Sequence, residues 1–149
     1  MCKDDGAGMT RQIIENHFLV SGSTKRPDLL RLQSKCHDAG FDLMRTGKFG
    51  IGVLSYFVLG DRVQVRTRRN LTSDMEPHGW VFEIEGIGSF GELRKDDAVA
   101  PGTEIALRLR DVIAEQATAW FDMLMDYLVR VVVKAPCHVR VQDIEGSVG

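Results

Sequence analysis

The middle of the chain alternates apolar and polar residues with a period of two. Val63 and Val65 alternate with Arg62, Gln64 and Arg66, and the same alternation recurs around Phe82 and around Leu107. A strand with one buried and one solvated face has this pattern. It therefore predicts strands of a mostly antiparallel sheet at residues 62–66, 80–85 and 104–110, and a last short strand at 138–141.

Helical segments precede and follow these strands. Thr10 is placed to cap a short helix that ends near residue 17, and a second helix is expected at 28–38. The apolar run 53–59 predicts a buried helix that stops at Gly60. Helices packed on one mostly antiparallel sheet define an α+β fold, a two-layer sandwich.

A longer helix is predicted from about residue 115 to 133, because apolar residues recur there at three- and four-residue steps. Such a stripe is far more often core than a partner-binding face. It consists of Ala117, Trp120, Phe121, Leu124, Leu128 and Val131.

Composition narrows the class of protein. With 149 residues, 44% of them apolar and 27% charged, the chain is expected to form one domain over residues 1–149. A net charge of −2 gives no reason to expect nucleic acid as a partner. We expect a cytoplasmic protein without a membrane partner, because no apolar run approaches about 20 residues and no leader is recognisable.

Two further groups of residues, the Cys-His pairs and a set of arginines, could form binding sites or could be ordinary structural and surface residues. The pairs Cys36-His37 and Cys137-His138 could meet at zinc, but adjacent strand residues point to opposite faces, so no metal site is expected. Arginines concentrate on one predicted strand, where a solvated sheet edge is favoured over a nucleic-acid contact. They are Arg62, Arg66, Arg68 and Arg69.

The first glycine cluster is D-D-G-A-G-M at residues 4–9. An acid at a strand end followed by glycines lets the backbone turn sharply while the carboxylate stays fixed. A buried carboxylate needs hydrogen-bond donors, and an adenine amino group is one. Taken alone, the cluster is more often a structural turn. A calcium loop is disfavoured because the spacing of its ligands is absent.

The second cluster is G-K-F-G-I-G at residues 47–52, directly before the predicted helix. Main-chain N–H groups and the positive helix end can hold an anion there. No Gly-Lys-Ser/Thr follows, which excludes a Walker A loop, and no strand leads into it, which excludes a Rossmann fingerprint. Alone, the cluster is equally a helix entry. The polar stretch between the two clusters has the character of a binding loop or lid.

Four segments in this order resemble the motifs of the GHKL ATPases, which have the Bergerat fold. The closest resemblance is to the N-terminal ATP-binding domain of heat-shock protein 90 chaperones. It extends from Asp4 to about Val141. The segments are D-D-G-A-G-M-T at 4–10, S-G-S-T-K at 21–25, G-K-F-G-I-G at 47–52 and P-G-T-E-I at 101–105.

The resemblance implies a binding site for ATP or ADP. Asp4 would accept a hydrogen bond from the adenine amino group, helped by a bound water. Thr103 would contact the same water network. Residues 18–46 would form the lid. The adenine turn would include Gly6, Gly8 and Met9, and the phosphates would lie on the backbone of Lys48, Phe49, Gly50, Ile51 and Gly52. A direct contact of the Lys48 ammonium with the γ-phosphate is the less favoured alternative.

The family also has a helix before its first glycine motif, with a glutamate that prepares the attacking water and an asparagine that binds Mg²⁺. This sequence has no counterpart before Asp4, so the resemblance implies a partial ATP-binding domain, and no catalytic or metal-binding residue is assigned. The chain by itself is expected to hydrolyse ATP poorly or not at all. Implied partners are an adenine nucleotide, the rest of a larger parent protein, a second copy in a homodimer, and unidentified client proteins.

Two alternatives stay open at this point. One is a nucleotide sensor or protein-interaction module without turnover, which tight ADP binding without hydrolysis would select. The other is the ATPase domain of a DNA-repair or topoisomerase member of the same superfamily.

Overall fold

The computed structural model describes residues 1–20, 27–41, 52–70, 78–114, 116–132 and 138–141. These residues fall into two compact units, Met1–Arg108 and Leu109–Gly149. Helices and one sheet make up the first unit, so the predicted α+β class is confirmed. The expectation of a single domain over 1–149 stays a prediction.

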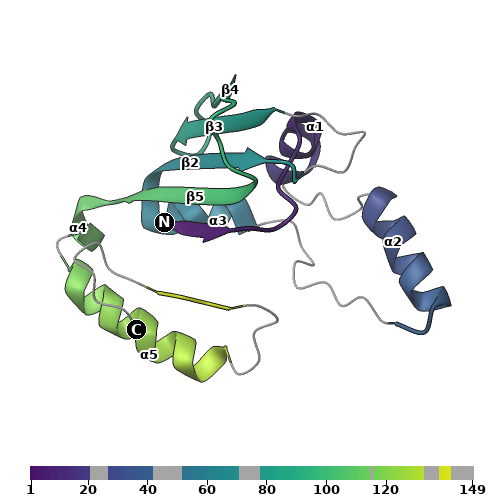
Figure 1. Ribbon diagram of the computed structural model, residues 1–149. Coiled ribbons are helices and arrows are strands. Elements are labelled where there is room, and N and C mark those ends of the chain that lie inside the picture. The colour runs from purple at the N-terminus through teal and green to yellow at the C-terminus, as the bar shows by residue number, and fades with distance from the viewer. Residues whose placement is uncertain (21–26, 42–51, 71–77, 115, 133–137, 142–149) are drawn as a thin grey trace. The chain divides into compact units, whose positions relative to one another are not determined.

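Five strands form one sheet, in the order β1-β5-β2-β3-β4 (Figure 1). The pairs β1–β5, β2–β3 and β3–β4 are antiparallel. The strands are β1 (Cys2–Asp4), β2 (Gly60–Arg68), β3 (Gly79–Glu85), β4 (Glu92–Lys95) and β5 (Gly102–Leu109). The three strands predicted from the alternation are confirmed. β4 was not predicted, because Leu93 is its single apolar residue and no alternation can be recognised.

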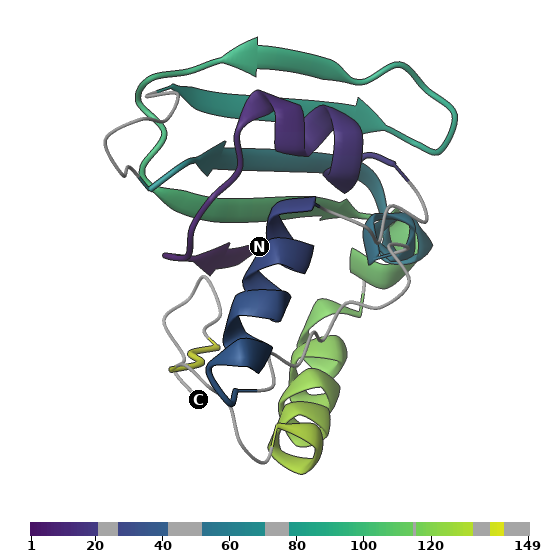
Figure 2. The same ribbon diagram turned by 90° about the vertical axis from the view of Figure 1, so that its right-hand side faces the viewer.

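One face of this sheet carries the core of the first unit. Val63 and Val65 of β2 are fully buried and form a cluster with Phe82 of β3 and Phe57 of α3 (Gly52–Leu59). Met9 and Phe18 pack against the same cluster. The short helices α1 (Arg11–Ile13) and η1 (Ile14–Phe18) lie across the strands (Figure 2). The helices therefore cover the face to which the odd-numbered residues of β2 point.

The predicted helices of the first unit are confirmed, with one correction. Thr10 caps α1 as expected, since its hydroxyl accepts a hydrogen bond from the Ile13 N–H. The second predicted helix is α2 (Pro27–Asp38). The helix α3 was expected to be buried, but only Phe57 is, while Leu54, Val58 and Leu59 are exposed. A helix that is apolar all round still rests on the sheet with one side only.

The arginine-rich strand is a second correction. β2 was expected to be a sheet edge, but it is the central strand of the five. Its even-numbered side chains lie on the face away from the core and contact acids or carbonyls of neighbouring segments. Arg62 pairs with Glu83, Arg66 lies 3.8 Å from Asp96, and Arg68 donates to the Asp97 carbonyl at 3.3 Å. These arginines therefore connect β2 to β3 and to the segment that follows β4.

The second unit contains α4 (Asp111–Ala114) and α5 (Ala117–Val131). The long helix is confirmed, and the core packing expected of its apolar stripe stays a prediction. The strand expected at 138–141 is wrong, because these residues have no regular structure. Among the described helices, none combines the length and the apolar character that crossing a membrane requires.

Candidate functional site

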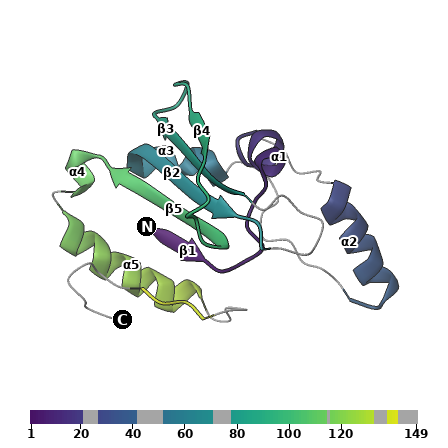
Figure 3. The same ribbon diagram turned by 45° about the horizontal axis from the view of Figure 1, so that its top comes forward.

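The candidate site begins where β1 meets β5. Asp4, the last residue of β1, lies directly opposite Thr103, the second residue of β5. Residues paired in this way point to the same face of a sheet. The Thr103 hydroxyl lies 3.1 Å from the hydroxyl of Thr67, whose side chain is on the core face. The carboxylate of Asp4 and the hydroxyl of Thr103 therefore share that face, on two strands that lie side by side (Figure 3).

Gly102 allows the two strands to approach at this point. Its φ of +107° is in the region that favours glycine, and a Cβ there would lie 2.2 Å from the Asp4 carbonyl oxygen. No other residue fits without moving β1 away from β5. The predicted G-T pair at 102–103 thus has a steric reason in the fold.

The turn after β1 fixes the orientation of the Asp4 carboxylate. The Gly6 N–H donates to Asp4 Oδ1 at 2.9 Å, which closes an Asx turn. Among the described residues nothing donates to the second carboxylate oxygen. Asp4 is exposed, so this oxygen remains available to a ligand or to water.

Gly8 allows this turn to pack closely against the end of β2. Its φ is +65°, and a Cβ would lie 1.9 Å from the Arg68 carbonyl oxygen. The Asn70 N–H also donates to the Ala7 carbonyl at 3.0 Å. Backbone contacts at two successive residues therefore hold the glycine turn on the sheet.

Thr67 connects the parts of the site. It is fully buried, and its hydroxyl accepts a hydrogen bond from the Met9 N–H and donates one to the Gly102 carbonyl, both at 2.9 Å. A hydroxyl has a single proton. Since that proton goes to Gly102, the 3.1 Å contact with Thr103 requires Thr103 to be the donor.

This direction of the hydrogen bonds decides the chemistry of the surface. The Thr103 proton points to Thr67, so Thr103 offers only lone pairs to the open side of the site. The ionised Asp4 carboxylate is also an acceptor without a proton. Side by side, the two residues form a patch that accepts hydrogen bonds and donates none, and it selects ligand groups or waters that carry N–H or O–H.

Thr67 lies outside the motifs from which the site is predicted. A signal was present: β2 buries Val63, Val65 and then Thr67 at every second position, and a hydroxyl at a buried position needs partners. Identifying those partners requires β5 and the β1 turn to be brought together, which the alternation within β2 does not reveal.

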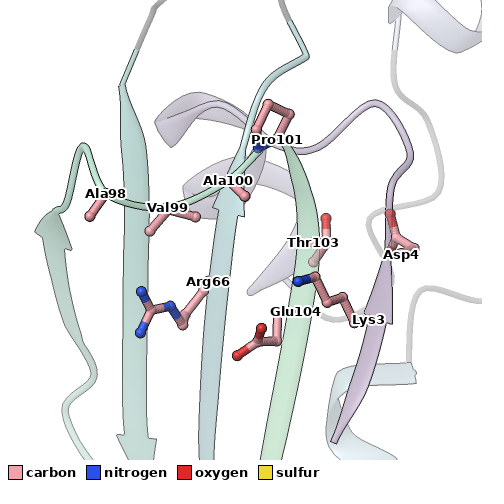
Figure 4. A pocket seen from close by; sticks show the side chains of 9 residues that line it. All are labelled: Lys3, Asp4, Arg66, Ala98, Val99, Ala100, Pro101, Thr103 and Glu104. Carbon is pink, nitrogen blue, oxygen red and sulfur yellow. The ribbon is translucent and has the colours of Figure 1, made fainter.

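A pocket of about 270 Å³ lies against the same strand ends. Because Lys3 pairs with Glu104, both point away from the face of Asp4 and Thr103. Figure 4 shows their side chains and that of Arg66 on the side of the strands away from the helical ribbon. Side chains of the outer face therefore line the pocket together with Asp4 and Thr103 of the acceptor patch. Its lining residues are Lys3, Asp4, Arg66, Ala98, Val99, Ala100, Pro101, Thr103 and Glu104.

The structure brings together one half of the predicted site. Asp4, Gly6, Gly8, Met9 and Thr103 surround the Thr67 hydroxyl or the turn that it holds. Gly52 begins α3. Lys48, Phe49, Gly50 and Ile51 lie outside the described residues, as do 21–26 and 42–46 of the predicted lid at 18–46. Phosphate binding and lid closure therefore stay predictions.

Comparison with known proteins gives the class of protein at a coarse level. Over 119 residues, 78% of its length, the chain is 35% identical to the chaperone protein HtpG of Cronobacter sakazakii. It is 34% identical over 109 residues to HtpG of Rhodospirillum rubrum, and 28% identical over 120 residues to HtpG of Borreliella afzelii. No protein-family model matches the chain.

These matches support a heat-shock protein 90-like chaperone domain, as the order of the motifs predicts. These three relatives are HtpG chaperones, and the chain spans 17–18% of their length. The similarity therefore concerns one part of a much longer protein.

Proposed function

We propose that this chain binds an adenine nucleotide as part of a GHKL-type ATPase related to heat-shock protein 90. The patch formed by Asp4 and Thr103 carries this proposal. It accepts hydrogen bonds only, and the amino group of adenine donates them. A water donating to both residues would extend the same network. The similarity to HtpG chaperones supports the assignment independently of the hydrogen bonds.

The order of the motifs indicates which residues would contact the rest of the base and the phosphates. Gly8 and Met9 would border the base, because their turn is fixed on the Thr67 hydroxyl beside the patch. The phosphates would lie on the main-chain amides of residues 48–52, before the N-terminus of α3. Mg²⁺ would accompany the phosphates.

For the parent protein, we propose that nucleotide binding closes the lid at 18–46 and changes the protein's conformation. A lid that closes over bound nucleotide is a common way to convert ligand state into shape. Dimerisation and the binding of client proteins would then depend on the nucleotide. These roles rest on the similarity to chaperones over part of their length.

The direct test is calorimetric titration of the 149-residue chain with ADP, comparing the wild type with Asp4→Asn. The amide replaces a charged acceptor by a neutral one and adds donors that the adenine amino group cannot use. We expect the Kd for ADP to rise about tenfold.

Asp5→Asn is the matched control. It removes the same charge one residue away, from a side chain with no hydrogen bond or ion pair among the described residues, so its Kd should stay within about twofold of the wild type. Equal Kd values for Asp4→Asn and the wild type, or no binding of ADP by the wild type, would contradict the proposal.

A further inference from the structure

Arg69 is the residue next to the proposed site that neither the motifs nor the proposed function uses. It follows the end of β2 and is half-buried. Its Nη1 donates to the Gly8 carbonyl oxygen at 3.1 Å, whereas the preceding arginines of β2 contact the outer face. Arg69 is therefore the arginine of this group that reaches the glycine turn.

The bond acts on a carbonyl whose direction sets the geometry of the site. Gly8 lies between Ala7, whose carbonyl accepts from Asn70, and Met9, whose N–H donates to Thr67. Arg69 fixes the carbonyl between them, so three successive residues of the turn are each bonded to the end of β2. A carbonyl that carries a charge-assisted hydrogen bond resists rotation of its peptide more than a solvated one.

We infer that Arg69 is a positioning residue for adenine recognition: through Gly8 it holds the turn 6–9 in the conformation that receives the base. The inference rests on the proposed function. It places the effect of Arg69 on the nucleoside part of the ligand and assigns it no contact with phosphate. Removal of the guanidinium then weakens binding of adenosine and of ADP by the same factor.

The experiment measures Kd values of the 149-residue chain for adenosine and for ADP, with Arg69→Gln, Arg69→Lys and Arg68→Gln. Arg68→Gln is the matched control, because it removes the same charge from the neighbouring residue, whose side chain donates to Asp97 on the outer face. Circular dichroism before each titration gives the folded fraction, so every Kd is expressed per mole of folded chain.

We expect Arg69→Gln to raise both Kd values about fivefold, since one hydrogen bond from a charged donor is lost. Arg69→Lys keeps a charged donor and should stay within about twofold of the wild type, as should Arg68→Gln. A rise for ADP alone would indicate a phosphate contact and overturn the inference. Unchanged Kd values for Arg69→Gln, or an equal rise for Arg68→Gln, would also overturn it. Failure of the wild type to bind either ligand would instead refute the proposed function, and it would be seen before any variant is made.

Discussion

Replacing Gly8 by alanine should destroy the nucleotide site and destabilise the first unit. The new Cβ would lie 1.9 Å from the Arg68 carbonyl oxygen, which belongs to the central strand and cannot move without breaking the sheet. The φ of +65° adds the strain of a left-handed conformation. We expect the free energy of unfolding to fall by about 3–5 kcal/mol, and ADP binding to weaken at least about 100-fold. Urea denaturation and calorimetry with ADP measure the two effects.

Gly88→Ala separates these two causes. Gly88 has a φ of +84°, but a Cβ there meets nothing within 4 Å. The strain of the left-handed conformation alone should cost about 1 kcal/mol, with no change in the Kd for ADP. Equal changes in the free energy of unfolding and in the Kd for ADP for Gly8→Ala and Gly88→Ala would contradict this prediction. The close contact with Arg68 would then not determine the geometry of the turn.

The period-two alternation predicts β2, β3 and β5 because one face of each strand is buried and the other is not. The order of the strands does not follow from such a pattern. The arginines of β2 have the composition of an exposed edge, yet β2 is central, because acids of β3 and of the segment after β4 pair with them. Long-range ion pairs of this kind leave no signal in the local sequence.

The candidate site also has residues that the sequence predicts and one that it does not. Asp4, Gly8 and Thr103 could be predicted because their motifs occur in an ordered series, and the structure brings them to one strand end. Thr67 belongs to no glycine motif, and its role appears only when three segments distant in sequence meet at one hydroxyl. The alternation in β2 marks it as buried and polar, but the direction of its hydrogen bonds depends on the folded arrangement.

This direction makes Thr67 the residue whose removal tests the acceptor patch. In Thr67→Val the side chain keeps nearly its shape, but the Met9 N–H and the Gly102 carbonyl lose their partner in a buried place. Thr103 also loses its acceptor, so its proton is free to turn toward the site and the patch no longer accepts hydrogen bonds only. We expect the free energy of unfolding to fall by about 3 kcal/mol and the Kd for ADP to rise about tenfold.

Thr67→Ser keeps the hydroxyl and removes one methyl group, which should cost about 1 kcal/mol of stability and leave the Kd for ADP within about twofold of the wild type. Urea denaturation gives the stabilities, and calorimetry on the folded fraction gives the affinities. Serine and valine variants with the same Kd would mean that the hydroxyl does not orient Thr103. Because the proton of Thr67 goes to Gly102, the affinity of the site for a donor such as the adenine amino group depends on a residue that need not touch the ligand itself.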